Sequence, residues 1–221
     1  MRALVVLAAA AAVFGTAPAL AQTSPFAAGV NLGTPGVGAE LQYQAAPGLV
    51  LRGGGDWLSY SRDETYSDIP YDGKLKSRTA GLFADWHPGG GAFLVSAGAY
   101  FGKRELELRS EPTGNVTVGG QTFTPAQIGR LEGEAKLSDV QPFVGLGFDN
   151  TFTSGGAWGF KALVGVSFSD DPEVDLRAVG GAFSDQPAVQ AAVAQEAADI
   201  REDASDYKYY PVVQIGVTRR F

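Results

Sequence analysis

Residues 210–221, YPVVQIGVTRRF, contain the pattern on which the fold prediction rests. Apolar side chains alternate there with polar or small ones. Successive side chains of a β-strand point to opposite faces, so Val213, Ile215 and Val217 fall on one face of a strand. This period of two predicts a strand and not a helix.

The same alternation recurs in five other segments, among them LVLRGGGDWLSYS from residue 49 and WGFKALVGVSF from residue 158. In each of them one face is apolar, and the other carries glycine, serine and isolated charges. A soluble sandwich would have a bulky polar second face. We therefore expect the apolar faces to meet lipid and the small residues to line a narrow, curved interior. The predicted strands lie at about 26–32, 37–44, 49–61, 74–87, 92–108, 130–149, 157–169 and 207–221.

The connections between these strands alternate in length. The turns at 45–48, 88–91 and 150–156 are short, whereas the connections after the third, fifth and seventh strands are long. Short turns on one side and long loops on the other are typical of an outer-membrane barrel. The prediction is an all-β fold, an eight-stranded antiparallel up-and-down transmembrane β-barrel with both ends in the periplasm. The alternative is a soluble barrel of lipocalin type, whose exterior should be polar.

The last long connection contains a segment rich in Ala, Gln and Glu, which are good helix formers. We expect a short helix from Pro187 to Asp203 in this extracellular loop. The helix either caps the barrel mouth or faces solvent.

The first 21 residues have the features of a secretory signal peptide. Arg2 supplies the positive charge, residues 4–14 are apolar, and Ala19 and Ala21 fit the small-x-small cleavage pattern. The prediction is a signal peptide over 1–21 and a barrel domain over 22–221, with an uncleaved anchor as the alternative. The chain has a formal net charge of −7 and no cysteine. This composition disfavours nucleic-acid binding and a disulfide scaffold.

The predicted facing directs an equal number of acidic and basic side chains into the lumen. Buried charges need partners, so this balance predicts a plugged lumen and not an open pore. The predicted lumen charge network comprises Glu40, Arg52, Asp56, Asp85, Arg104, Asp149, Lys161 and Arg220. The residues nearest the periplasmic strand ends are the strongest candidates for one network: Arg52, Asp85, Asp149, Lys161 and Arg220.

Aromatic residues occur near the ends of the apolar faces, as in the girdles of outer-membrane barrels. The predicted girdle consists of Trp57, Trp86, Phe93, Phe101, Phe148, Trp158 and Phe168. Lys74, Lys76 and Arg78 cluster at the outer end of the fourth strand, where they either pair with lipid phosphates or face solvent.

No catalytic or metal-binding constellation is evident in the sequence. His87 is the single histidine and precedes Pro88 in a short turn, with no triad motif around it. One histidine and no cysteine do not make an ordinary zinc site. The acidic runs SDDPEVD and DIREDASD lack the spacing of an EF-hand loop. We expect no enzymatic activity, no metal and no cofactor.

Several segments resemble a group of proteobacterial outer-membrane proteins: GDWLSYSRD, ADWHPGGGAFLVSAGAYF, DVQPFVGLGFDN, PEVDL and DYKYYPV. The architecture resembles the OmpA-, OmpX- and OmpW-type barrels. The resemblance implies a Gram-negative outer-membrane location and contact with outer-membrane lipids and lipopolysaccharide. It also implies recognition of the last strand by the barrel-assembly machinery through Val213, Ile215, Val217 and Phe221. Arg219 departs from this pattern, because an apolar residue is usual there.

The function expected from these observations is that of an integral outer-membrane barrel with a structural or surface-interaction role, acting as a monomer. One alternative is a narrow, porin-like pore or a conduit for small, hydrophobic molecules. A second alternative is a lipid-modifying outer-membrane enzyme.

Overall fold

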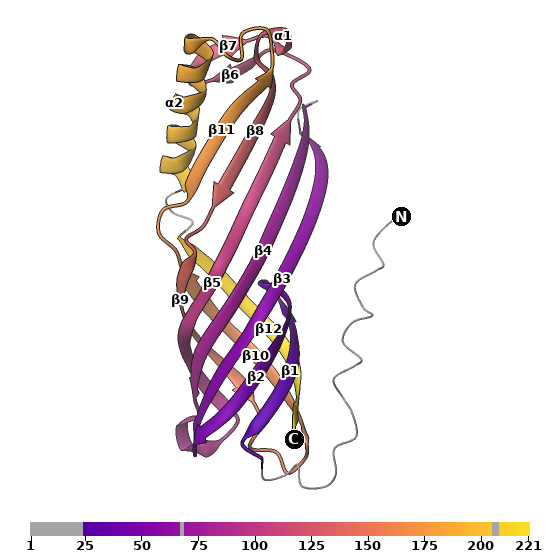
Figure 1. Cartoon of the computed structure of the whole chain (residues 1–221), viewed down its shortest axis with the longest axis vertical. Coiled ribbons are helices and arrows are strands. Elements are labelled where there is room, and N and C mark those ends of the chain that lie inside the picture. The colour runs from indigo at the N-terminus through magenta and orange to yellow at the C-terminus, as the bar shows by residue number, and fades with distance from the viewer. Residues whose placement is uncertain (1–23, 67–68, 205–207) are drawn as a thin grey trace.

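A computed structural model describes residues 24–66, 69–204 and 208–221. It is mainly antiparallel β-structure with one long helix (Figure 1). The predicted signal peptide lies outside the described residues. The strands are β1 Phe26–Gly33, β2 Gly36–Ala46, β3 Leu49–Tyr66, β4 Ile69–Trp86, β5 Phe93–Ser110, β6 Val116–Val118, β7 Gln121–Phe123, β8 Gly129–Lys136, β9 Val140–Asp149, β10 Trp158–Phe168, β11 Glu173–Gly180 and β12 Tyr209–Arg220. The helices are η2 Pro88–Gly90, α1 Pro125–Ile128 and α2 Pro187–Ala204.

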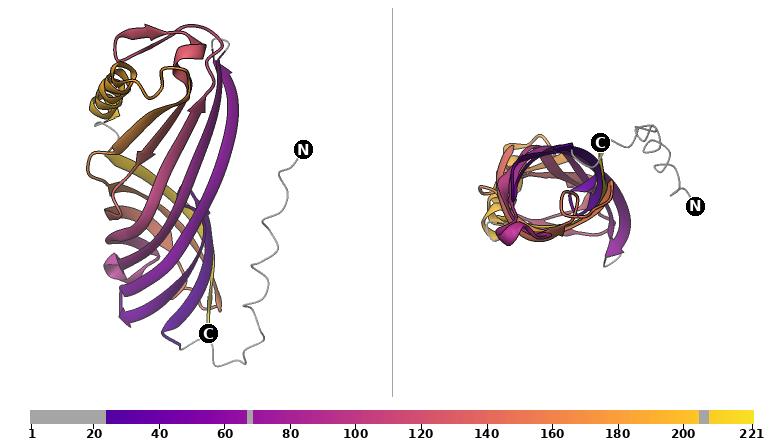
Figure 2. Two further views of the ribbon diagram at one scale, coloured as in Figure 1. Left: turned by 45° about the horizontal axis from the view of Figure 1, so that its top comes forward. Right: turned by 90° about the horizontal axis from the view of Figure 1, so that it is seen from below.

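Eight of the strands form a closed ring, which Figure 2 shows from below. Neighbouring strands along the chain pair from β1 to β5, and β5 then pairs with β9, β9 with β10, and β10 with β12. Pairing of β12 with β1, from Ala27 opposite Arg220 to Gly33 opposite Gln214, closes the ring. The predicted antiparallel barrel is confirmed.

The predicted strand over 130–149 consists of two strands. β8 pairs with β5 at Glu105–Lys136, and β9 pairs with β5 at Phe101–Val140, so both keep one register along β5. The interruption at residues 137–139 occurs where the outer neighbour changes from β11 to β10. β11 and the β6–β7 hairpin were not predicted, because they lie inside long connections with polar composition.

Three strands rise well above the ring. β3, β4 and β5 continue upwards, where β8 and β11 extend their sheet, while the β1–β2 hairpin ends much lower (Figure 1). The last β2–β3 pair is Val37 with Trp57, so β2 covers only the lower part of β3. The upper part of the molecule is therefore a curved, open wall and not a closed ring.

The predicted helix is confirmed as α2. Its Val189, Ala192 and Val193 pack with Ala178 of β11 and with the β6–β7 hairpin in a small apolar core. Cross-strand register puts Ala178 on the same face of the sheet as Leu108, which is the lumen-side face. α2 thus covers the β8–β11 part of the upper wall. In the part of the chain that the structure describes, no helix has the length and apolar character needed to cross a bilayer.

A second apolar core lies inside the ring and was not predicted. The rings of Phe83, Tyr100 and Phe143 pack edge to face, with centroids 4.9–5.7 Å apart. Leu94, Leu163 and Val212 complete this buried cluster. Glycines opposite the rings provide the space, because a Cβ on Gly165 would come within 2.6 Å of the Phe143 ring.

Gly165→Val should lower the free energy of unfolding by about 1–3 kcal/mol, because the added side chain clashes with the Val144 carbonyl oxygen and with the Phe143 ring. The measurement is urea unfolding in lipid vesicles, with heat-modifiability on gels as the test of folding. Gly155→Val is the matched control, since a Cβ at Gly155 meets nothing within 4 Å. Equal stability of the two variants would show that the lumen is not tightly packed around Gly165.

Candidate functional site: the polar lumen

The structure places all eight predicted lumen charges inside the molecule. Their exposed fractions lie between 0% for Lys161 and 9% for Asp56. Because such charges are destabilising without partners, their contacts define what the lumen can do.

Glu40 of β2 is at the centre of the network. Its carboxylate forms ion pairs with Lys161 of β10 and, at 3.8 Å, with Arg52 of β3. Gln42 Nε2 donates to Glu40 Oε1 at 2.9 Å, and Asn31 Nδ2 donates to Glu40 Oε2 at 3.4 Å. One carboxylate therefore links four strands across the lumen.

Arg52 binds Asp85 of β4 with two parallel hydrogen bonds. Nε donates to Asp85 Oδ2 at 2.7 Å, and Nη2 donates to Asp85 Oδ1 at 3.2 Å. Ser96 Oγ also donates to Asp85 Oδ1 at 2.5 Å, and the guanidinium lies 4.1 Å from the centroid of the Phe83 ring. This side-on geometry is the strong form of an arginine–carboxylate pair.

Asp149 of β9 joins the network through neutral groups. Gln42 Nε2 donates to its Oδ2 at 2.9 Å, and the backbone N–H of Thr151 donates to its Oδ1 at 2.8 Å. The Thr151 hydroxyl, which also hydrogen-bonds to Asp149, lies 2.6 Å from that of Thr218. Four of the five residues predicted as one network are thus connected, but Arg220 is not joined to them by the contacts described. Its Nε is buried without a hydrogen-bond partner.

The central role of Glu40 was not predicted, although the sequence contains a signal for it. Glu40 stands opposite Gly29 on β1 and Gly54 on β3. A Cβ at Gly54 would lie 3.1 Å from the Glu40 Cβ, so both glycines leave room for the side chain to reach the centre. A charged residue flanked by glycines on both neighbouring strands is the pattern to look for.

Arg104 and Asp56 lie in the lumen apart from this network. The Arg104 Nη1 donates to Gln141 and, at 3.1 Å, to Ser167. Asp56 Oδ1 accepts a hydrogen bond from Gln214 at 3.1 Å. Among the described residues, neither forms an ion pair, so the four acids and four bases do not pair one to one.

The outer surface of the ring is apolar. The seven predicted girdle residues are exposed by 37–57%. The predicted assembly residues of the last strand segment are also exposed, by 41–52%: Val213, Ile215, Val217 and Phe221. Arg219 lies on the same face with its guanidinium 5.7 Å from the centroid of the Trp158 ring.

His87 is buried in the turn between β4 and β5. Its Nδ1 is 3.0 Å from the carbonyl oxygen of Gly91, and its backbone N–H donates to Gly48 at 2.8 Å. These contacts hold two turns together at the end of the barrel.

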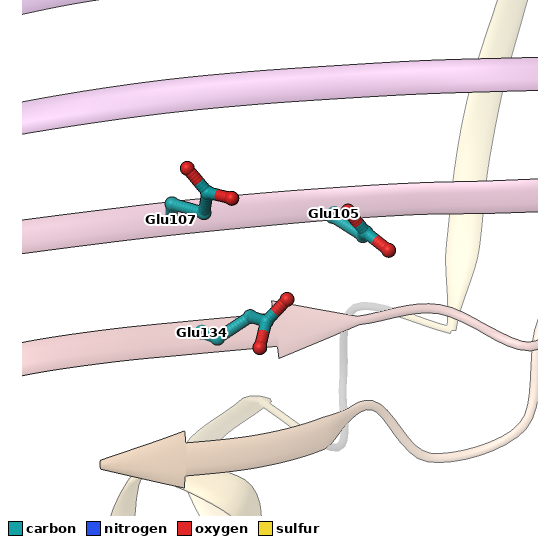
Figure 3. Close-up of side chains that lie close together, drawn as sticks. All are labelled: Glu105, Glu107 and Glu134. Carbon is teal, nitrogen blue, oxygen red and sulfur yellow. The ribbon is translucent and has the colours of Figure 1, made fainter. Parts of the chain in front are cut away.

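Three glutamates form a cluster on the outer face of the upper wall. Glu105 and Glu107 of β5 lie beside Glu134 of β8, with carboxylate oxygens within 4.8 Å of one another (Figure 3). Lys76 binds Glu107 at 2.5 Å, and Lys136 binds Glu134 at 3.0 Å. The hydrogen bond from Lys76 lowers the pKa of Glu107. The lysines already neutralise two of the carboxylates, and we assign this cluster no metal.

The fold is shared with solved outer-membrane β-barrels. The structure of CarO2 from Acinetobacter baumannii matches 90% of this chain and 99% of its own, with a TM-score of 0.62 and 25% sequence identity. CarO from the same organism matches the same shares of the chains, with a TM-score of 0.57 and 26% identity. No protein-family model and no curated protein matches the sequence. The chain has the fold of the small Gram-negative outer-membrane β-barrel proteins.

Lys161→Met should lower the free energy of unfolding by about 3–5 kcal/mol, because the buried Glu40 charge then loses its ion pair with Lys161 and keeps only the longer one with Arg52. Combining it with Glu40→Gln should recover part of this loss. Urea unfolding of the four forms in vesicles gives the coupling energy. Arg130→Met is the control, since its exposed ion pair with Glu132 contributes less than about 1 kcal/mol. Strictly additive effects would show that the two residues do not interact.

Proposed function

We propose that the protein is a closed, non-enzymatic barrel of the Gram-negative outer membrane with a structural or surface-interaction role. The observation that carries the proposal is the network around Glu40, which crosses the lumen with every charged member at most 4% exposed. The aromatic core of Phe83, Tyr100 and Phe143 supports the same conclusion, because it adds bulk that excludes water.

The outer surface supports the proposed membrane location. Trp57, Arg78 and Lys103 are neighbours across β3, β4 and β5 and lie on the outward face. An aromatic ring beside two exposed cations fits the boundary between hydrocarbon and phosphate groups. This row favours contact with outer-membrane lipids and lipopolysaccharide. Recognition of the exposed β12 face by the barrel-assembly machinery remains part of the same proposal.

The upper wall is the part available for surface interactions. It consists of five strands of the large sheet, with the β6–β7 hairpin and α2 packed against it in an apolar core. A packed wall of this kind presents a fixed surface, in contrast to flexible loops. A conductance measurement tests this proposal against the alternative of a narrow pore. The pairing of the lumen charges around Glu40 favours the proposal over the conduit and the enzyme.

The refolded protein should show no stable conductance steps in planar bilayers, since the network and the aromatic core fill the lumen. Replacing Glu40, Arg52, Asp85 and Lys161 together by serine should produce measurable steps, provided that the variant retains heat-modifiability. Protease protection in vesicles confirms insertion of both proteins. Large, reproducible channels formed by the unmodified protein would overturn the closed-barrel proposal.

A further inference from the structure

Arg104 is a buried cation in which the Nε and Nη2 side of the guanidinium has no hydrogen-bond partner among the described residues. It is 3% exposed, and its Nε and Nη2 atoms are buried without hydrogen-bond partners. Only Nη1 is engaged, by Gln141 and Ser167. Its guanidinium lies 4.9 Å from the Tyr100 ring and 4.2 Å from the Tyr210 ring. Buried charged groups are normally paired and hydrogen-bonded, so this arrangement requires an explanation.

Arg52 shows what the same edge does when it has a partner. Its Nε and Nη2 hold the two oxygens of Asp85 side by side. In Arg104 the equivalent pair of N–H groups is fixed by the rings of two tyrosines and by the contacts of Nη1. A guanidinium edge with two unpaired N–H groups matches an oxyanion of carboxylate geometry. Arg220 differs from Arg104 in this respect. Among the described residues, Nε is the one Arg220 nitrogen that is buried without a hydrogen-bond partner.

Other polar atoms near Arg104 are also buried without partners. Ser77 stands opposite Arg104 on β4, and Thr79 follows on the same face. The oxygens of Ser77, Thr79 and Tyr100 have no hydrogen-bond partner among the described residues. Each hydroxyl can donate as well as accept, so these groups can complete the coordination of an anion.

An apolar strip begins directly above Arg104. By strand alternation Leu106 and Leu108 share the lumen-side face of Arg104, and they are 39% and 45% exposed. Leu75 stands opposite Leu106, and Tyr60, 55% exposed, stands opposite Leu75. From Arg104 to Leu108 this strip extends along the strand by about 13 Å.

The strip is accessible from above. α2 covers the neighbouring β8–β11 part of the wall and leaves Leu106 and Leu108 exposed. Within the described residues, β3 has no partner on its β2 side beyond Trp57. Below Arg104 the aromatic core around Phe143 and the network around Glu40 together close the lumen. The upper lumen is thus open to the extracellular side and closed towards the periplasm.

We propose that the upper lumen binds an amphipathic carboxylate of medium chain length. The carboxylate accepts two hydrogen bonds from Nε and Nη2 of Arg104, and the alkyl chain lies on Leu75, Leu106 and Leu108. The Asp56 carboxylate, one cross-strand row below, disfavours a dianionic phosphate at this position. The proposal concerns binding and is independent of whether the barrel conducts ions.

The probe is octanoate labelled with ¹³C at the carboxyl group, titrated by NMR into the full chain in phosphatidylcholine nanodiscs, with empty nanodiscs as the blank. Saturable binding is expected, with a shift of the carboxyl resonance. Arg104→Met should weaken the affinity by at least about tenfold, and Arg104→Lys should weaken it less. Arg109→Met, which removes an exposed arginine from the outward face of the same strand, should have no effect. Heat-modifiability verifies that each variant is folded.

A second comparison tests the two halves of the site separately. Leu106→Thr should weaken octanoate binding about threefold to tenfold while leaving the much weaker binding of acetate unchanged, because acetate has no alkyl chain to lose contacts. Octanol should bind no better to the unmodified protein than to Arg104→Met. Equal octanoate affinity of the unmodified protein and Arg104→Met, or no binding above the nanodisc blank, would overturn the proposal.

Discussion

The structure depends on one constraint: in a lipid environment a sheet must satisfy its own backbone hydrogen bonds. β12 pairs with β1, and β5 pairs with β9, so the ring has no free edge. Closure has a second consequence, because every other side chain then points into a narrow interior. Polar side chains that enter this interior lose water and must find partners within it. The network around Glu40 is the result of this requirement.

The interior is filled by two kinds of contact that depend on each other. The charged groups of Glu40, Arg52 and Lys161 connect strands that are not neighbours, while the edge-to-face rings of Phe83 and Phe143 occupy the remaining width. The Arg52 guanidinium belongs to both, since it pairs with Asp85 and stacks on Phe83. A contact of this kind lowers the effective dielectric around the ion pair and so strengthens it.

Strand alternation was sufficient to predict which residues face the lumen and which face outwards, because side-chain direction follows from position along a strand. It could not predict which charges meet across the lumen. That depends on strand tilt and on the space left by glycines, as Gly29 and Gly54 show for Glu40. The aromatic core escaped prediction for the same reason, since Phe143 lies on a face that is otherwise small. β11 was missed because it lies inside a long, polar connection, where strand alternation gives a weak signal.

Two of the lumen arginines, Arg52 and Arg104, show why burial alone does not define a structural role. Arg52 and Arg104 are buried to the same degree, and each lies against aromatic rings. Arg52 lies where the ring is closed on all sides, and its fork is occupied by Asp85. Arg104 lies at the level where the wall changes from ring to open sheet, and its fork is unoccupied by any described side chain. At this boundary a buried charge without a partner can bind an anionic group that enters from the extracellular side. The apolar strip above it favours an anion that carries an alkyl chain.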